Sequence, residues 1–305
     1  MSSLAPEAAR VIPQLPDEVL HRLSPDSREC IERLLAHQAP PPTDYGIVKQ
    51  AAVLVALYEQ PDEGKLRVLL TTRAKTLRRH PGLTALPGGK VDPEDPSPIH
   101  TARREAFEEV DLPLDHPSIH QITTLEPVMT ILPLNAHMRN HIIVTPVVCL
   151  ISDPTLVDHL RPNPDEVDYV FSHPLEAVLR GQPDASLVDT LAELGGEWWP
   201  HEEEFYSMAD RRFRTTHSPI KGLTSDVLIE VATIAHGVSP PYGALAPSQQ
   251  PFGELISHVV TELPGVLQRD AEAARDGIIV QEKRPEWGSG VDGVTIPSAE
   301  KWSVK

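Results

Sequence analysis

Three glutamates in the first half of the chain have the residue type and spacing to hold a divalent cation. Glu105, Glu108 and Glu109 occupy positions i, i+3 and i+4 of one segment, and in a helix these positions fall within an arc of roughly 100°. Like charges this close repel one another unless a cation neutralises them. Carboxylate oxygens suit Mg²⁺ and Mn²⁺. The spacing therefore indicates a Mg²⁺ or Mn²⁺ site, and a solvated acidic helix surface is the alternative that spacing alone leaves open.

A glycine-containing turn and an acidic loop precede these glutamates. The turn, Pro87-Gly88-Gly89-Lys90, allows a close approach of the backbone. The loop that follows carries three more carboxylates, at Asp92, Glu94 and Asp95. Arg104 lies beside the glutamates and can brace one of the carboxylates. This combination favours a binding site over an ordinary helix surface.

The carboxylates are expected on a helix that opens at Ser97-Pro98, because serine is a common N-cap and proline a common first helical residue. Its packing face is predicted to carry four apolar side chains, namely Ile99, Ala102, Ala106 and Val110. Buried strands are predicted at residues 51–58, 66–71, 141–151 and 167–171. A further helix is predicted from residue 224 or 225 to His236, ending at Gly237. Strands, helix and strands in this order imply a layered α/β domain.

Two proline-rich clusters, residues 39–43 and 239–251, suggest boundaries. Residues 1–44 are predicted to form a helical N-terminal extension, with a helix that begins at Ser24-Pro25. Residues 45–237 are predicted to form one central domain that carries the candidate site. Residues 238–305 are predicted to be a proline-rich linker, a helix with apolar spacing from Phe252 up to Pro264, and a loose C-terminal tail.

The composition of the chain indicates which classes of binding partner and which cellular compartment are expected. The chain has 305 residues, with 44 acidic against 27 basic side chains and a net charge of −17. This charge argues against a general affinity for nucleic acid or an anionic membrane, and no apolar run approaches the ~20 residues of a membrane span. Two distant cysteines and the absence of a signal-peptide-like start favour a reducing, intracellular compartment. The expected partner is a small molecule, and the oligomeric state stays open.

The segment from Arg104 to Leu112, REAFEEVDL, resembles the second half of the Nudix box, in which Arg-Glu precedes a Glu-Glu pair. The loop before it is one residue longer than the general box and places Asp95 where the first Glu is expected. This spacing is typical of the coenzyme A diphosphatase branch. A second motif of that branch is also matched, by Leu69 to Ala74 (LLTTRA), Arg78, Gly82 and Leu86 to Gly89 (LPGG). The segment RFRTTHSPIKGLTSDVLI resembles the closing segment of fungal members.

One position departs from the box, because Asp111 replaces the glycine that follows the helix. That glycine adopts a left-handed backbone conformation, which aspartate tolerates at a cost of order 1 kcal/mol. We therefore expect a weakened helix cap and a working site. The same departure is the main argument for the alternative that the chain is a catalytically inactive Nudix-fold binding protein.

The resemblance implies the Nudix fold, a mixed β-sheet sandwiched between helices, over roughly residues 45–237. It implies metal-dependent hydrolysis of the diphosphate of coenzyme A and its derivatives to 3′,5′-ADP and phosphopantetheine or its acyl form. The residues implied are metal ligands Glu105, Glu108 and Glu109, catalytic residues Glu109, Glu166 and Arg104, and substrate-binding residues Arg73, Arg78, Gly88, Gly89 and Lys90. Either Glu109 or Glu166 is the candidate general base.

Two questions of identity stay open at this point. Another nucleoside diphosphate derivative, such as NADH or ADP-ribose, is the alternative substrate within the enzymes. Fungal members of the branch are often peroxisomal, but the last residues, WSVK, do not fit an S-K-L type of address. Peroxisome, mitochondrion and cytosol are therefore not resolved.

Overall fold

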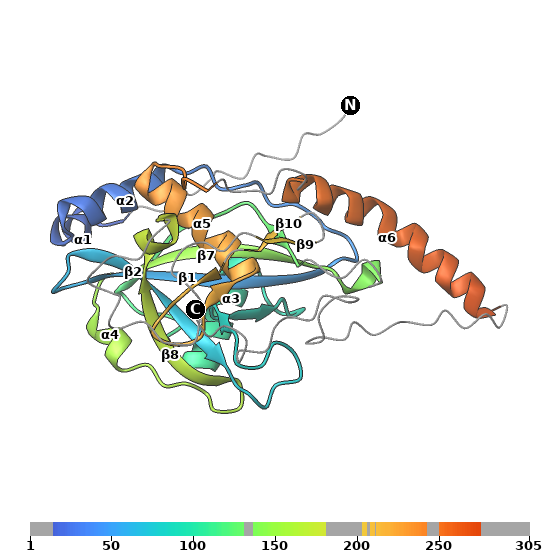
Figure 1. Ribbon diagram of the computed structural model, residues 1–305, viewed down its shortest axis with the longest axis horizontal. Coiled ribbons are helices and arrows are strands. Elements are labelled where there is room, and N and C mark those ends of the chain that lie inside the picture. Colours follow the sequence, from blue (N-terminus) through green and yellow to red (C-terminus); the bar gives the residue numbers. More distant parts are fainter. Residues whose placement is uncertain are drawn as a thin grey trace, which may run out of the picture.

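A computed structural model describes residues 15–130, 137–180, 203–205, 208–210, 212–242 and 250–275 (Figure 1). The predicted C-terminal tail from residue 276 onward lies outside the described residues. Within them, none of the helices has the length and apolar character needed to cross a bilayer.

A mixed β-sheet forms the centre of the protein. Its longest strands are β1 (Lys49–Gln60), β2 (Lys65–Arg73), β7 (Ile142–Ile151) and β8 (Val167–Pro174). β1 runs parallel to β7 and antiparallel to β2, and β8 pairs antiparallel with β2. The shorter strands are β3 (Thr84–Ala85), β4 (Gly88–Lys90), β5 (Ile119–Thr124) and β6 (Val128–Met129). The order is β3-β2-β1-β7-β5, while β4 pairs with β1 and β6 with β7.

Helices cover both faces of this sheet, which confirms the predicted fold class. Helix α3 (Pro98–Val110) packs on β1 and β7, and its Ala102, Ala106 and Val110 are buried with alternate residues of those strands. The other face is covered by α2 (Pro25–Ala36) and α5 (Leu223–His236). Strands buried on two faces are expected to be apolar almost throughout, and the runs AAVLVALY and IIVTPVVCLI meet that requirement.

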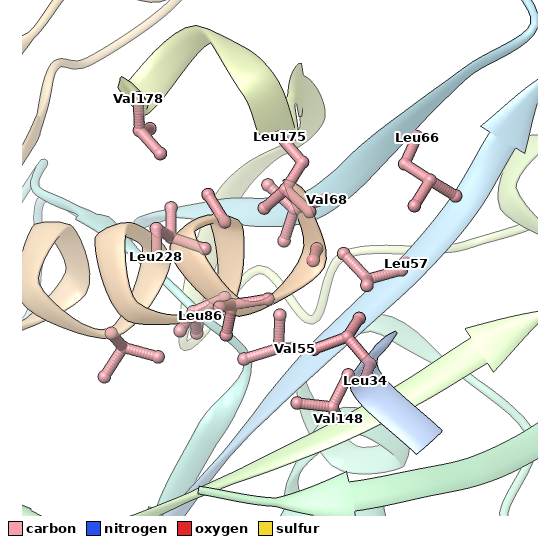
Figure 2. Packing of buried hydrophobic residues seen from close by; sticks show 14 of the residues in the cluster. Leu34, Val55, Leu57, Leu66, Val68, Leu86, Val148, Leu175, Val178 and Leu228 are labelled. Carbon is pink, nitrogen blue, oxygen red and sulfur yellow. The ribbon is translucent and has the colours of Figure 1, made fainter. Parts of the chain in front are cut away.

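The larger core lies between the sheet and the helices α2 and α5. Figure 2 shows Leu34 of α2 beside Val55 and Val148 of the two central strands, with Leu228 of α5 near Leu86. All five side chains are almost fully buried. Helix α2 is therefore part of the same core as the sheet. Burial of one such side chain stabilises the fold by about 1.5–3 kcal/mol. Its predicted start is confirmed, because the Ser24 hydroxyl accepts a hydrogen bond from the Ser27 amide at 3.2 Å.

Helix α6 (Phe252–Arg275) differs from the prediction, which ended it at Pro264. A proline inside a helix removes one backbone hydrogen bond and usually kinks or breaks the helix. Here contacts hold the helix on both sides of the proline. Before it, Ile256, Val259 and Leu263 pack against Val48, Met129 and Ile143. After it, Asp270 Oδ2 lies 2.6 Å from His137 Nε2.

The remaining elements are short. They are the helices α1 (Asp17–Arg22) and α4 (Thr155–Asp158), the 3₁₀ helices η1 (Met138–Asn140) and η2 (Leu175–Leu179), and two strand pairs, β9 (Glu203–Phe205) with β10 (Met208–Asp210) and β11 (Arg212–Phe213) with β12 (Ile220–Lys221).

Candidate active site

Helix α3 presents the predicted carboxylates and is capped at both ends. At its start Ser97 accepts a hydrogen bond from the His100 amide at 3.3 Å, as predicted. At its end Asp111 adopts the left-handed conformation, with φ 60° and ψ 30°, and its amide bonds back into the helix. The expected left-handed cap is therefore present with an aspartate. The prediction that Ile99 packs was wrong, because this side chain is 36% exposed while Ala102, Ala106 and Val110 of the same face are buried.

The three glutamates of α3 differ in burial. Glu109 is only 6% exposed, and Glu105 is half-buried, while the Glu108 side chain is 48% exposed. Burial, together with the negative charges of Glu105 and Glu166, raises the pKa of Glu109 to about 8, while the charge of Arg73 acts in the opposite direction. Burial likewise raises the pKa of Glu105. A buried carboxylate that is costly to ionise is stabilised in its anionic form by a nearby cation.

The two glycines of the turn are required by close contacts. A Cβ on Gly88, whose φ is +156°, would lie 2.7 Å from Val53 Cα and still closer to the carbonyl oxygen of Ala52. A Cβ on Gly89 would lie 2.5 Å from each carboxylate oxygen of Glu105. The Gly88 amide also donates a long hydrogen bond of 3.4 Å to Glu109 Oε2. β4 therefore lies directly against the carboxylates of α3.

Arg104 donates to several acceptors at once, in keeping with the prediction that it braces one of the nearby carboxylates. It pairs with Asp95 at 2.9 Å and with Glu105 and Glu108 at 3.0 Å each, and it donates to the carbonyl of Lys90 at 3.0 Å. Asp95 is the principal partner: its side chain is 3% exposed, and the Arg104 guanidinium holds its pKa well below the ordinary range. The structure thus places Arg104 among the carboxylates as a positioning residue.

Two residues of this brace were missed at the level of sequence. The buried Thr101 hydroxyl donates to Asp95 Oδ2 at 2.9 Å, and His100 Nδ1 lies 2.8 Å from Asp95 Oδ1. Both lie three or four residues after the N-cap Ser97, where a carboxylate from the preceding loop can contact the first turn of the helix. That spacing was the only indication of their role that the sequence offered.

The loop before β8 brings Glu166 and Arg73 to the carboxylates. The amides of Arg161 and Asn163 donate to the carbonyls of Val110 and Glu109, at 3.0 and 2.8 Å, and so satisfy carbonyl groups at the end of α3. The carbonyl of Glu166 accepts from the amide of Ala74, which follows Arg73 at the end of β2. Glu166 is exposed, and both its charge and that of Arg73 act on Glu109.

The other two predicted substrate-binding side chains lie elsewhere. Arg78 is exposed in the loop between β2 and β3. Lys90 is paired with Ala51 in the β1–β4 ladder, while Gly89 is paired with Ala52. Since paired residues share a face and successive residues alternate, the Lys90 side chain lies on the face of the sheet opposite Glu105. Only the main chain of Lys90 belongs to the brace.

The donor set fits a hard divalent cation, although no three His, Cys, Asp or Glu side chains within the described residues are drawn together into a ready ligand sphere. Glu105 and Glu108 point to the Arg104 guanidinium. The charges of Glu105 and Glu166 nevertheless raise the pKa of Glu109, and that of Glu166 also raises the pKa of Glu105, so these carboxylates lie near one another. Carboxylates that repel one another in this way are a suitable site for Mg²⁺ or Mn²⁺.

Comparison with known proteins agrees with this geometry. The family model described as "NUDIX domain" matches residues 48–215. Nudix hydrolase 15, mitochondrial, from Arabidopsis thaliana is 34% identical over 194 residues, which cover 64% of this chain and 61% of that protein. An uncharacterized Nudix hydrolase NudL from Cronobacter sakazakii is 43% identical over 132 residues, 43% of this chain and 60% of that protein.

The match spans about three fifths of the length of these curated relatives. Among solved structures, a binary complex of an Ap4A hydrolase from C. elegans is similar with 21% identity and a TM-score of 0.34, over 42% of this chain and 82% of that chain. The family model matches more than half of the chain. The chain belongs to the Nudix family.

Proposed function

We propose that this protein hydrolyses the diphosphate linkage of coenzyme A and its derivatives with the help of Mg²⁺ or Mn²⁺. The observation that carries the proposal is the convergence of Glu105, Glu109 and Glu166 with the guanidinium of Arg73 at one end of the sheet. Carboxylates suit the metal, and a cation beside them suits a substrate phosphate. The products would be 3′,5′-ADP and phosphopantetheine or its acyl form.

The choice of coenzyme A rests on the motif that leads into the glycine turn. It contributes Arg73, whose charge bears on Glu109, and Gly88-Gly89, whose backbone lies against the carboxylates. The motif and the box therefore meet at one place in the fold, although Arg78 of the same motif is exposed in its loop.

In this reaction a water oxygen forms a bond to one phosphorus atom, the bridging P–O bond breaks, and the proton of the water passes to a carboxylate. A bound divalent cation would supply charge stabilisation on the diphosphate and lower the pKa of the attacking water. Glu105, Glu108 and Glu109 would hold the cation. Arg104 keeps Glu105 and Glu108 in place, and Arg73 would orient a diphosphate oxygen.

Two carboxylates can receive the proton. Burial raises the pKa of Glu109 in the absence of metal, and a bound cation would favour its ionised form, which can accept a proton. Glu166 is exposed beside it and is free of any role in the brace of Arg104. Substitution by glutamine separates the two, because protonation of the base lowers the rate on the acidic side of the pH profile, and the variant of the base loses this dependence.

We further propose that residues 45–237 form the catalytic unit and that residues 1–44 and 238–305 are additions to it. Helices α2 and α6 from these additions pack on the sheet of the central unit. Removal of either addition is therefore expected to lower the stability of the central unit, in addition to any change in activity.

The test is a substrate panel of coenzyme A, acetyl coenzyme A, NADH and ADP-ribose, each with Mg²⁺, Mn²⁺ or chelator, for the protein and its Glu109→Gln variant. Metal-dependent turnover of the coenzyme A compounds, reduced about 100-fold or more in the variant, supports the proposal. Faster turnover of NADH or ADP-ribose would assign the other substrate class. Tight binding of coenzyme A without turnover by metal-loaded, folded protein would instead assign a binding role.

A further inference from the structure

Four cationic residues come from elements at the end of the sheet near the glycine turn, and the charges of three of them act on the fourth, Lys49. Lys49 opens β1, Lys90 closes β4, Arg139 belongs to η1, and Arg79 lies in the loop between β2 and β3. We refer to them as the Lys49 cluster. All four side chains are exposed, and Lys90 is also one of the predicted substrate-binding residues.

The strand register brings three of these elements together. Ala51 is paired with Lys90, and the Val91 amide donates to the Gln50 carbonyl at 3.0 Å. Lys49 precedes Ala51 by two residues, so its side chain shares the face of Lys90. On the other side of β1, Lys49 is paired with Ile142 of β7, and η1 ends two residues before Ile142. Arg139 is therefore placed at the same end of the sheet.

The electrostatics of Lys49 are consistent with this arrangement. Partial desolvation by the neighbouring chain lowers the pKa of its ammonium, and the charges of Lys90, Arg79 and Arg139 lower it further. These three charges are all positive, in a protein whose net charge is −17. Cations that repel one another are stabilised by a bound anion, and a phosphate group offers several oxygens to more than one donor.

The Lys49 cluster and the carboxylates lie on opposite faces of the same short strand. Gly89 of β4 lies against Glu105, while the next residue, Lys90, belongs to the cluster. The carbonyl of Lys90 accepts from Arg104 at 3.0 Å, so this strand contacts the carboxylate site as well as the cluster. A ligand that reaches around the end of β4 can place one anionic group at each site.

We propose that the Lys49 cluster binds a phosphate monoester of the substrate, separate from the diphosphate that is cleaved. The inference rests on the proposed function and assigns a second site to it. Coenzyme A carries such a group, its 3′-phosphate, and only one ribose separates that group from the diphosphate. The cluster gives the protein a means to distinguish coenzyme A from NADH and ADP-ribose, which lack the 3′-phosphate.

The experiment compares coenzyme A with 3′-dephospho-coenzyme A for the protein and for its Lys49→Ala, Arg139→Ala and double variants. Loss of one charge-assisted contact costs about tenfold in affinity. We therefore expect the double variant to lower the ratio of kcat/KM for coenzyme A over its dephospho form by about 10- to 100-fold, through KM. The matched control is Arg22→Ala, which removes an exposed cation on α1 and should leave the ratio unchanged. Thermal unfolding confirms that each variant is folded.

A binding measurement keeps this inference separate from the proposed function. Calorimetry with 3′,5′-ADP and with 5′-AMP, both without turnover, reports the contribution of the 3′-phosphate alone. Tighter binding of 3′,5′-ADP, lost in the double variant, supports the cluster even if no substrate is hydrolysed. Equal binding of the two nucleotides by the protein, or a preference that the double variant retains, overturns the inference and leaves the hydrolase proposal intact.

Discussion

Replacement of Gly89 by alanine is expected to reduce activity while the fold is retained. The added Cβ would lie 2.5 Å from both carboxylate oxygens of Glu105, and ordinary contacts of this kind are about 3.5 Å. The carboxylate must therefore move by about 1 Å. A misplacement of this size at a catalytic group costs about 100-fold in rate. The free energy of unfolding should change by less than about 1 kcal/mol, because the displaced group is the end of a flexible side chain.

Gly88→Ala is the matched comparison, with the opposite balance of effects. Here the added Cβ meets main-chain atoms, Val53 Cα at 2.7 Å and the Ala52 carbonyl oxygen, and φ is +156°. Neither atom can move without distortion of β1, so we expect a loss of about 3 kcal/mol or more in the free energy of unfolding.

The assay for both variants is kcat/KM on coenzyme A with Mg²⁺, beside urea unfolding followed by circular dichroism. A Gly89→Ala protein that keeps activity within about twofold of the parent would refute the placement of Glu105 as a metal ligand. A Gly89→Ala protein destabilised as much as Gly88→Ala would refute the separation of the two glycines into a site contact and a backbone contact.

Three further predictions concern single carboxylates. Burial raises the pKa of Glu230 to about 7 from an ordinary 4.5, so the folded state loses stability as the pH rises from 4.5 to 7. Glu230→Gln removes this ionisation. In urea titrations it should raise the free energy of unfolding by about 1–3 kcal/mol at pH 8 and by far less at pH 5. Asp111→Gly should stabilise the α3 cap by about 0.5–1 kcal/mol in thermal unfolding and leave kcat/KM unchanged, whereas a large gain in activity would indicate that the aspartate impairs the site. Arg104 lowers the pKa of Asp95, so the ionised carboxylate stabilises the folded state above pH 3.8, and this stabilisation is lost as the pH falls below that value. Asp95→Asn should therefore lower the free energy of unfolding by about 2 kcal/mol at pH 7 in urea titrations, and the two proteins should become more similar in stability on acidification.

Features that depend on residues close in sequence could be predicted well. The caps at Ser24, Ser97 and Gly237 lie where propensities place them, and the long buried strands follow from their apolar runs. The carboxylate face of α3 follows from helical spacing alone. In each case the determining contacts lie within one or two helical turns or along one strand.

Features set by tertiary contacts could not be predicted. Ile99 keeps the helical spacing of a packed residue but is exposed, whereas Ala102 of the same face is fully buried. Pro264 would end an isolated helix, but contacts with β6 and η1 hold α6 on both sides of it. Lys49 and Arg139 are 90 positions apart and meet only through the register of β1 with β7. No local pattern marks such a pair.

The most direct test of the account is hydrolysis of coenzyme A in ¹⁸O-labelled water with Mg²⁺ or Mn²⁺, followed by mass spectrometry of the products. The account predicts 3′,5′-ADP and phosphopantetheine, one of them carrying a single ¹⁸O atom on its new phosphate oxygen, and almost no product from Glu109→Gln. Cleavage at any other bond, turnover that persists in chelator, or full activity of the Glu109→Gln variant would contradict it.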